Sequence, residues 1–459
     1  MSTETPDLST IIKAYDVRGI VPDQLDATIA RALGAAFVRF LASEGPVDRI
    51  VVARDMRESG VALGAAFAEG ATAQGVCVVD AGLASTDLLY YGAGTLQIPG
   101  AMFTASHNPA RYNGIKMCRA GAAPIGQDTG LAAIRELAQG YLASGLPGFD
   151  GPPGTVGQQD LLAGYASYVK GLVPGLDAIR RLKVVVDAGN GMGGHTVPTT
   201  FSGLPLDVIE MYFELDGSFP HHEANPIDPA NLRDLQARVI AEGADIGLAF
   251  DGDADRCFVV DEQGGIVSPS TLTALIAARE LAREPGSTII HNLITSRSVP
   301  EVIVENGGSP VRTRVGHSFI KAEMARTGAV FGGEHSGHFY FRDFWNADSG
   351  MLAALHAMAA LGGQDGPLSG LLSPYDRYAA SGEINSTVDA PAAKIAAIAG
   401  KYADADQDEL DGLTVDVGNG AWFNVRASNT EPLLRLNVEA PAEVTMAALR
   451  DDVLAVIRS

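Results

Sequence analysis

Residues 246–260 read Ile-Gly-Leu-Ala-Phe-Asp-Gly-Asp-Ala-Asp-Arg-Cys-Phe-Val-Val. Two apolar runs, 246–250 and 257–260, flank a turn with carboxylates at every second position, Asp251, Asp253 and Asp255. Short apolar runs on both sides of a glycine-containing turn predict a strand, a loop and a second strand. Three Asp side chains cannot all ionise close together without a counter-charge, which a hard divalent cation, Mg²⁺ or Ca²⁺, would supply through oxygen ligands.

The residue after the third carboxylate is Arg256, which suits an anionic group, especially a phosphate, bound beside the metal. Three other interpretations compete. The loop could be an exposed acidic turn. An EF-hand would use Glu262 as its last ligand, but Arg256 stands where that loop needs glycine, and the flanks are strand-like. A phosphatase-like loop would use Asp251 as a covalent nucleophile, and this alternative stays open on these residues alone.

The length and charge limit the class of protein. A chain of 459 residues is too long for one ordinary core, and its length suggests about three domains. The composition is globular, with 46% hydrophobic and 19% charged residues. The net charge of −22 argues against nonspecific binding to nucleic acid or to an anionic membrane. An anionic substrate therefore needs a local cluster of basic side chains.

The cysteines and the N-terminus indicate the compartment. Cys77, Cys118 and Cys257 are odd in number and scattered, which is typical of a reduced protein without disulfides or a zinc site. The acidic N-terminus lacks a hydrophobic signal core, and no apolar run approaches the length of a bilayer span. We expect a cytoplasmic protein with no membrane or nucleic-acid partner.

One pattern of strand, polar loop, helix and strand occurs three times. It begins at the apolar strands 49–53, 183–186 and 288–290. The repetition predicts three related α/β domains in tandem, with parallel strands and right-handed crossovers. In each domain a polar loop follows a later strand. These loops are 104–109, 251–256 and 333–338. Ligands of open parallel sheets lie beyond the carboxyl ends of the strands, so the three loops could face one central cleft.

Segments rich in glycine and proline, 146–157 and 362–370, separate parts of the chain. After the second separator the pattern changes to strands near 383–388, 413–417 and 422–426, with a helix from Ala392 and a final helix. This predicts a smaller α+β domain. The expected domain limits are 1–150, 151–258, 259–368 and 369–459.

The loop Thr104–Pro109 follows an apolar strand, so Ser106 would lie at an exposed strand end, where a serine can act as a covalent nucleophile. An ordinary turn residue is the alternative. The adjacent His107 is not an obvious base, because sequence neighbours usually point apart. Lys116 follows in Asn-Gly-Ile-Lys and could clamp a phosphate or move a proton.

The loop Gly333–His338 contains Glu334, Ser336 and His338, side chains that suit hydrogen bonds to vicinal hydroxyl groups. Its two histidines lack a third partner for a metal site. His317, in Val-Gly-His-Ser, could join this loop. The last polar loop combines a guanidinium with hydroxyl, amide and backbone N–H donors, a good phosphate cradle, although such residues also favour ordinary capped turns. Its candidate ligands are Arg426, Ser428, Asn429 and Thr430.

Together these loops indicate one enzyme acting on a phosphorylated sugar. The motifs Thr-Ala-Ser-His-Asn-Pro, Asp-Gly-Asp-Ala-Asp-Arg, Gly-Glu-x-Ser-Gly-His and Arg-x-Ser-Asn-Thr-x-Pro stand in this order. The set resembles the α-D-phosphohexomutase superfamily, most closely its bacterial phosphomannomutase/phosphoglucomutase branch, over almost the whole chain. The resemblance implies four domains around a deep cleft, the first three of common topology.

The resemblance also implies roles for the loop residues. Ser106 would carry the phosphoryl group as phosphoserine, and its oxygen would join Asp251, Asp253 and Asp255 around Mg²⁺. The residues expected around the reaction centre are Arg256, His107, Lys116, Arg18 and Tyr15, with Lys116 in proton transfer. The residues expected on the hexose are Glu334, Ser336 and His338, joined by His317. The residues expected on the phosphate that is not transferred are Arg426, Ser428, Asn429 and Thr430.

The implied reaction interconverts mannose 1-phosphate and mannose 6-phosphate, with glucose phosphates as close second substrates and glucosamine phosphate third. It would pass through a hexose 1,6-bisphosphate, which also serves as activator, and would need a mobile fourth domain. The family's mannose and glucose enzymes often carry Met, and its glucosamine enzymes Gln, where this chain has His335, so the sequence leaves the preferred sugar open. It leaves monomer and homodimer open as well.

Overall fold

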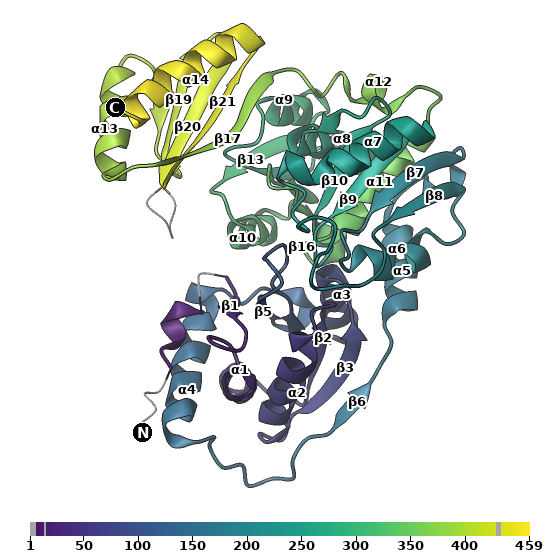
Figure 1. The fold of residues 1–459 in the computed structure, drawn as a ribbon, viewed down its shortest axis with the longest axis vertical. Helices are drawn as coiled ribbons and strands as arrows, with labels where there is room; N and C mark the ends of the chain where they lie inside the picture. Colours follow the sequence, from purple (N-terminus) through teal and green to yellow (C-terminus); the bar gives the residue numbers. More distant parts are fainter. Residues whose placement is uncertain (1–5, 13–14, 428–432) are drawn as a thin grey trace. The chain divides into compact units, whose positions relative to one another are not determined.

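A computed structural model describes residues 6–12, 15–427 and 433–459 (Figure 1). The chain divides into two compact units. The first contains Met1–Val267 and Ser336–Gly370, and the second contains Ser268–His335 and Leu371–Ser459. The chain returns to the second unit within α12 (Leu368–Leu372). Within the described residues, no helix combines the length and the apolar character needed to cross a bilayer.

The first sheet has six strands in the order β1-β5-β4-β2-β3-β6. Its strands are β1 (Val17–Ile20), β2 (Arg49–Arg54), β3 (Cys77–Leu83), β4 (Gly100–Phe103), β5 (Tyr112–Cys118) and β6 (Val156–Gln158). β2 runs parallel to β3 and β4, and β3 runs parallel to β6. β5 is antiparallel to both of its neighbours, so the sheet is mixed.

Helices cover both faces of this sheet. They are α1 (Ala27–Glu44), α2 (Ser59–Thr72), α3 (Thr86–Leu96) and α4 (Leu131–Ser144). α1, α2 and α4 share one apolar core with alternate residues of β2, and α3 packs on the other face. A Cβ atom on Gly34 would lie 2.0 Å from the backbone oxygen of Phe67, and one on Gly70 would lie 2.0 Å from that of Arg31. Only glycine therefore allows α1 and α2 to pack this closely.

The second sheet has the order β11-β10-β9-β7-β8. Its strands are β7 (Leu182–Asp187), β8 (Leu206–Met211), β9 (Ile246–Phe250), β10 (Cys257–Asp261) and β11 (Ile266–Val267). β7 is parallel to β8 and β9, whereas β10 is antiparallel to β9. The other helices and strands of the first unit are α5 (Leu162–Leu172), α6 (Gly193–Phe201), α7 (Arg233–Glu242), β15 (Phe339–Phe341), β16 (Ala347–Asp348) and α11 (Gly350–Gly362).

The second unit begins with another α/β segment. In it β12 (Thr288–Asn292) is parallel to β13 (Ser309–Thr313) and β14 (Phe331–Gly333). Its helices are α8 (Pro269–Arg283), α9 (Ser298–Glu305) and α10 (His317–Thr327). Pro269 at the first helical position and the Ser268 hydroxyl, which accepts from the Ser270 N–H, fix the start of α8.

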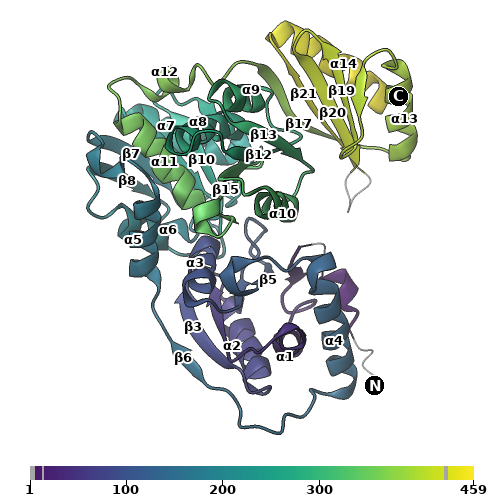
Figure 2. The ribbon, with the colours of Figure 1, turned by 180° about the vertical axis from the view of Figure 1, so that it is seen from behind.

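The C-terminal segment forms an antiparallel sheet in the order β17-β21-β20-β19-β18 (Figure 2). Its strands are β17 (Ala379–Thr387), β18 (Asp406–Asp408), β19 (Leu413–Gly418), β20 (Ala421–Ala427) and β21 (Leu433–Ala440). α13 (Pro391–Lys401) and α14 (Glu443–Ile457) contribute to an apolar core with one face of the sheet. The opposite face carries polar residues. They are Asp406, Asp408, Thr414, Asp416 and Glu439, and the indole of Trp422 lies among them.

The predicted fold class of three α/β segments and a smaller α+β segment is confirmed, as are the strands expected on both sides of Asp251–Arg256. β5 and β10 are antiparallel to their neighbours. Each follows the preceding strand through a short loop without a crossover helix, so the chain reverses its direction.

Candidate active site

The metal loop, residues 251–256, joins two buried antiparallel strands. Phe250 pairs with Cys257, so the six residues between them form a tight turn in which Ala254 has a positive φ of 58°. The carboxylates of Asp251, Asp253 and Asp255 are at most 1% exposed, and their candidate ligand atoms lie within 4.8 Å of one another. The EF-hand interpretation is wrong, because strands flank this loop.

The charges of the loop fit a divalent cation. Three buried carboxylates face two basic side chains, Lys116 and Arg256. Among the described residues, Asp253 Oδ1 and Asp255 Oδ1 are buried without a hydrogen-bond partner. Burial raises the pKa of Asp251 although Arg256 opposes the shift, so the protein alone does not balance the third negative charge. An all-oxygen donor set with surplus negative charge is what Mg²⁺ or Ca²⁺ prefers.

Ser106 lies against this loop. Its Oγ donates a hydrogen bond of 2.9 Å to Asp251 Oδ2. A Cβ atom on Gly252 would lie 2.5 Å from the backbone oxygen of Ser106, so glycine is needed for the close approach of the two loops. Ser106 itself has a positive φ of 49°, a sparsely populated conformation for a non-glycine residue that often marks a functional site.

The same backbone turn corrects the expectation for His107. Its Nδ1 lies 3.1 Å from Ser106 Oγ, because the positive φ directs the two neighbouring side chains together. Arg256 Nη2 lies 2.5 Å from the same ring nitrogen, and its Nε donates to Asp251 Oδ2 over 2.9 Å. A guanidinium has only donors, so Nδ1 accepts and the ring is neutral. Burial, with Arg256 and Arg18 nearby, lowers the pKa of His107 to about 2.

Lys116 projects from β5 into the same site. Its Nζ donates to Asp253 Oδ2 over 2.8 Å and to Asp255 Oδ2 over 2.6 Å. Burial alone would lower the pKa of Lys116, but these two carboxylates raise it well above its ordinary value. The two carboxylates therefore hold the amine as an ammonium.

Arg18 of β1 also contacts the serine loop. Its Nη1 donates to Asn108 Oδ1, and its Nη2 lies 2.5 Å from Asp16 Oδ2. Tyr15 stands just before β1. The structure thus brings Arg18 to the loop of Ser106, and the role of Tyr15 stays a prediction.

Arg57 was not assigned a role from the sequence, although its polar loop after β2 marks it as a candidate. It is 1% exposed and binds four backbone oxygens of the serine loop and its surroundings. The acceptors are the backbone oxygens of Ser106, Asn108, Pro109 and Tyr112, at 2.6–3.0 Å. Its Nε pairs with Asp55, and its guanidinium lies 5.1 Å from the ring centroid of Phe219. Arg57 therefore holds the Ser106 loop in shape.

Thr86 is a second residue without an assigned role. Its hydroxyl donates to Asp253 Oδ2 over 2.6 Å, and its N–H donates to the Asp253 backbone oxygen over 3.0 Å. The adjacent Asp87 accepts from the hydroxyls of Ser85, Tyr165 and Ser349. Burial raises the pKa of Asp87 to about 6. Apart from the contact between Ser85 and Asp87, these hydrogen bonds join residues far apart in sequence, so no local pattern marks them.

The loop Gly333–His338 contributes to both units. In the first unit, His338 Nε2 lies 3.7 Å from Asp255 Oδ1, and Ser336 Oγ lies 3.1 Å from His338 Nδ1. Asp348 of β16 also offers a ligand atom within 4.8 Å of those of Asp255 and His338. The structure therefore brings His338 to the metal loop, where sequence reasoning had assigned it only to the sugar.

In the second unit, Glu334 is 2% exposed and its Oε1 accepts from Gly316 N at 3.2 Å and Asn292 Nδ2 at 3.3 Å. His317 begins α10. Arg426 Nη2 forms an ion pair of 2.7 Å with Glu383 Oε2, and Arg435 Nη1 lies 3.5 Å from the other oxygen of the same carboxylate. Ser428, Asn429 and Thr430 lie outside the described residues.

A serine held against a buried tri-aspartate loop, with basic side chains on both, is typical of an enzyme that transfers phosphoryl groups. Profiles of the phosphoglucomutase/phosphomannomutase family match four successive parts of the chain. They are alpha/beta/alpha domain I at residues 9–142, domain II at 163–265, domain III at 268–378, and the C-terminal domain at 383–456. The chain belongs to this family.

Individual relatives extend over nearly the whole chain. Phosphohexose mutases of Xanthomonas campestris pv. campestris are 40% identical over 95% of this chain and 96% of theirs. A phosphomannomutase/phosphoglucomutase of Pseudomonas aeruginosa is 38% identical over 98% of this chain and 96% of its own. The crystal structure of a family protein from Burkholderia thailandensis has a TM-score of 0.87 and 34% identity, over 98% of this chain and 97% of that one.

Proposed function

We propose that this protein is a phosphohexomutase that interconverts mannose 1-phosphate and mannose 6-phosphate, and also the corresponding glucose phosphates. The contact that carries the proposal is the 2.9 Å hydrogen bond from Ser106 Oγ to Asp251 in the metal loop. Family membership and the relatives named as phosphomannomutases and phosphohexose mutases support it.

In the first half-reaction the phosphoserine form of Ser106 transfers its phosphoryl group to the free 6-hydroxyl of a hexose 1-phosphate. The bond between phosphorus and Ser106 Oγ breaks, and a bond between phosphorus and the sugar oxygen forms. The hydroxyl proton must leave, and the serine oxygen must gain one. Lys116 and His338 lie at the metal loop as candidates to move protons. The product is hexose 1,6-bisphosphate.

In the second half-reaction the bisphosphate binds in the opposite orientation. The bond between phosphorus and the sugar's 1-oxygen breaks, and a bond between phosphorus and Ser106 Oγ forms. The Ser106 hydroxyl gives up its proton, the 1-oxygen gains one, and hexose 6-phosphate is released. The chain thereby returns to its phosphoserine form. Because the bisphosphate can also phosphorylate a free Ser106, we expect it to act as the activator.

Three groups position the transfer. Arg57 fixes the backbone of the serine loop, Arg256 links His107 with Asp251, and Arg18 reaches Asn108. The guanidinium of Arg256 and the ammonium of Lys116 can stabilise negative charge that develops on the phosphoryl oxygens. Asp251, Asp253 and Asp255 would hold Mg²⁺, which when bound neutralises charge on the transferring group.

We assign the sugar hydroxyls to Glu334, Ser336, His338 and His317, and the distal phosphate to the loop of Arg426, Ser428, Asn429 and Thr430. The support is that Glu334 and Arg426 carry charged groups at the ends of β14 and β20. Tyr15 belongs to the serine side of the site. Domain limits of 1–150, 151–258, 259–368 and 369–459 and a cytoplasmic location complete the proposal.

The contacts disfavour an Asp-dependent sugar phosphatase. That mechanism needs a free Asp251 carboxylate as nucleophile. Asp251 instead accepts from Ser106 Oγ, from Arg256 Nε and from the Arg256 backbone N–H.

The test is a mutase assay with Mg²⁺ and a trace of hexose 1,6-bisphosphate. Wild-type protein should convert mannose 1-phosphate into mannose 6-phosphate, and Ser106→Ala should lose nearly all of that rate while keeping the wild-type unfolding temperature. Release of inorganic phosphate without 6-phosphate would favour the phosphatase, and full activity of Ser106→Ala would contradict the assignment.

A further inference from the structure

His335 stands in the middle of the loop Gly333–His338, but its ring is bound by α8. Its Nδ1 lies 3.0 Å from Ser270 Oγ, and Ser270 is 1% exposed. Ser270 Oγ also accepts from the Ser296 N–H over 3.0 Å. The hydroxyl has one hydrogen and two lone pairs, so it can pair with His335 Nδ1 in either tautomer of the ring while it accepts from Ser296. Burial lowers the pKa of His335, which agrees with a neutral ring in this role.

The neighbouring Glu334 contacts different elements. Its carboxylate accepts from Asn292 Nδ2, on β12, and from Gly316 N, on the loop before α10. Glu334 is the side chain that the proposed function puts on the hexose. His335 and Glu334 are neighbours in sequence, but they contact different partners, and only Glu334 is assigned to the sugar.

The contact of His335 continues into the C-terminal sheet. Ser296 follows β12, and the next residue, Arg297, donates its backbone N–H to Glu439 Oε1 over 2.8 Å. The same carboxylate oxygen accepts from Trp422 Nε1 over 2.8 Å. Glu439 is 3% exposed. Hydrogen bonds therefore run from His335 through Ser270 and the backbone at Ser296–Arg297 to β20 and β21.

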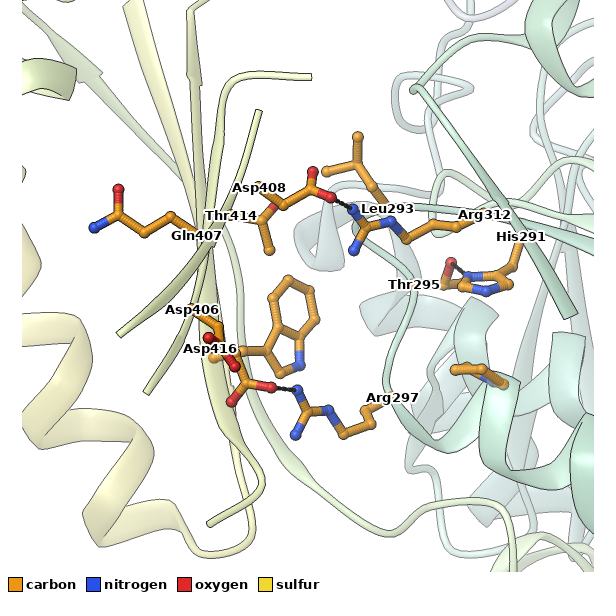
Figure 3. Close-up of a pocket in the computed structure, with 12 residues that line it drawn as sticks. His291, Leu293, Thr295, Arg297, Arg312, Asp406, Gln407, Asp408, Thr414 and Asp416 are labelled. Atoms are coloured by element: carbon orange, nitrogen blue, oxygen red, sulfur yellow. Dashed lines mark hydrogen bonds and ion pairs between the residues drawn. The ribbon is translucent and has the colours of Figure 1, made fainter. Parts of the chain in front are cut away.

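Ion pairs reinforce the same junction (Figure 3). Arg297 lies 2.5 Å from Asp416, and Arg312 lies 2.5 Å from Asp408. A pocket of about 210 Å³ lies between these two pairs, with Trp422 in its wall. An interface built of ion pairs around a pocket is polar and incompletely packed, so direct hydrogen bonds matter for its geometry.

We propose that His335 is a positioning residue, which ties the loop of Glu334 to the junction with the C-terminal sheet and does not distinguish mannose from glucose. The proposal rests on the proposed mutase function, since it concerns the same loop. In such a reaction the bisphosphate binds in two orientations, and each requires the sugar-binding loop and the sheet of Arg426 to hold one geometry. A hydrogen-bonded connection between the loop and the sheet lowers the entropic cost of ordering them when substrate binds. This effect is the same for mannose and glucose phosphates.

Two variants of His335 test this. His335→Leu removes the hydrogen-bonding ring nitrogen, and His335→Asn keeps an amide, which can donate or accept, near the position of Nδ1. We expect His335→Leu to lower kcat/KM for mannose 1-phosphate and glucose 1-phosphate equally, by about fivefold to tenfold, the effect of one net hydrogen bond. We expect His335→Asn to recover most of the loss. A change of the mannose-to-glucose ratio beyond about tenfold would overturn the proposal, as would unchanged kcat/KM for both sugars.

Ser270, the partner of His335 in this contact, gives an independent test. Ser270→Ala should reproduce the loss of His335→Leu, and the double variant should fall no further in kcat/KM or in unfolding temperature. Ser309→Ala, at an exposed hydroxyl of β13, is the matched control and should change neither. Additive losses in the double variant would show that the contact does not act as one unit. If the wild-type protein interconverts neither sugar phosphate, the proposed function fails, while additivity of the unfolding temperatures still tests the hydrogen-bonded connection.

Discussion

Replacing Arg57 tests whether a buried guanidinium shapes the serine loop. Arg57→Met keeps much of the side-chain length but removes every donor. The change leaves the fully buried Asp55 without its cation, and four backbone oxygens without their donor. Breaking a buried ion pair costs about 3–5 kcal/mol. The loss of the donor to the four backbone oxygens costs less where water can enter and donate to them instead.

We therefore expect Arg57→Met to lower the free energy of unfolding by about 3–5 kcal/mol, which corresponds to a fall of roughly 10 °C in unfolding temperature for a domain of this size. Because a displacement of about 1 Å at a reacting atom costs on the order of 100-fold in rate, kcat should fall by at least that factor even well below the new unfolding temperature. Differential scanning fluorimetry and the mutase assay at a low temperature measure the two effects separately.

Two controls make the result specific to Arg57. Arg31→Met removes an exposed pair with Glu69, whose side chains are 53% and 59% exposed, and should change stability by less than about 1 kcal/mol. Arg57→Lys keeps the charge beside Asp55 but cannot reach all four carbonyls, so it should retain more stability than activity. Wild-type kcat in Arg57→Met would refute the reasoning, because the loop would then hold its shape without this side chain.

Three further predictions concern neighbouring features. Gly252→Ala places a methyl group 2.5 Å from the Ser106 backbone oxygen and should lower kcat about 100-fold, measured in the mutase assay, with a smaller effect on unfolding temperature. Asp253→Asn removes one negative ligand and should weaken Mg²⁺ binding in isothermal titration calorimetry at least tenfold; unchanged affinity would exclude Asp253 as a ligand. Both ring nitrogens of His222 face acceptor oxygens, of Glu223 and Asp187, so only the protonated ring donates to both. Burial lowers the pKa of His222, but Asp187 outweighs it and raises the pKa above 6.5, so the stabilisation is full below pH 6.5 and is lost as pH rises through the raised value. The unfolding temperature of His222→Gln should thus approach that of wild type at higher pH, and a constant difference would contradict the ion pair.

Much of the site could be predicted because its signals are local. Asp251, Asp253 and Asp255 lie in one turn between two apolar runs, so the alternation of carboxylates and the flanking strands follow from adjacent residues. Ser106 lies after an apolar strand in the same way. Open sheets place ligand-binding groups in the loops at the ends of their strands, so the sequences of these loops predict the candidate residues that they contain.

Other parts depend on contacts that no local pattern contains. Arg57 is 49 residues from Ser106, and Thr86 is 167 residues from Asp253, so their pairing exists only in the folded chain. The position of His107 depends on the positive φ at Ser106. Because serine rarely adopts this conformation, the sequence gives no sign of it. The contact between His335 and Ser270 spans 65 residues, so the sequence of the loop predicts a role for His335 only beside the sugar.

The central claim is that Ser106 carries the phosphoryl group. The most direct measurement is mass spectrometry of the protein after incubation with Mg²⁺ and hexose 1,6-bisphosphate, before and after a chase with mannose 1-phosphate. We expect one phosphoryl group on Ser106 that is stable to acid and to hydroxylamine and is lost in the chase as hexose bisphosphate. A hydroxylamine-labile phosphoryl group on Asp251, or no phosphoryl group on Ser106, would contradict the claim.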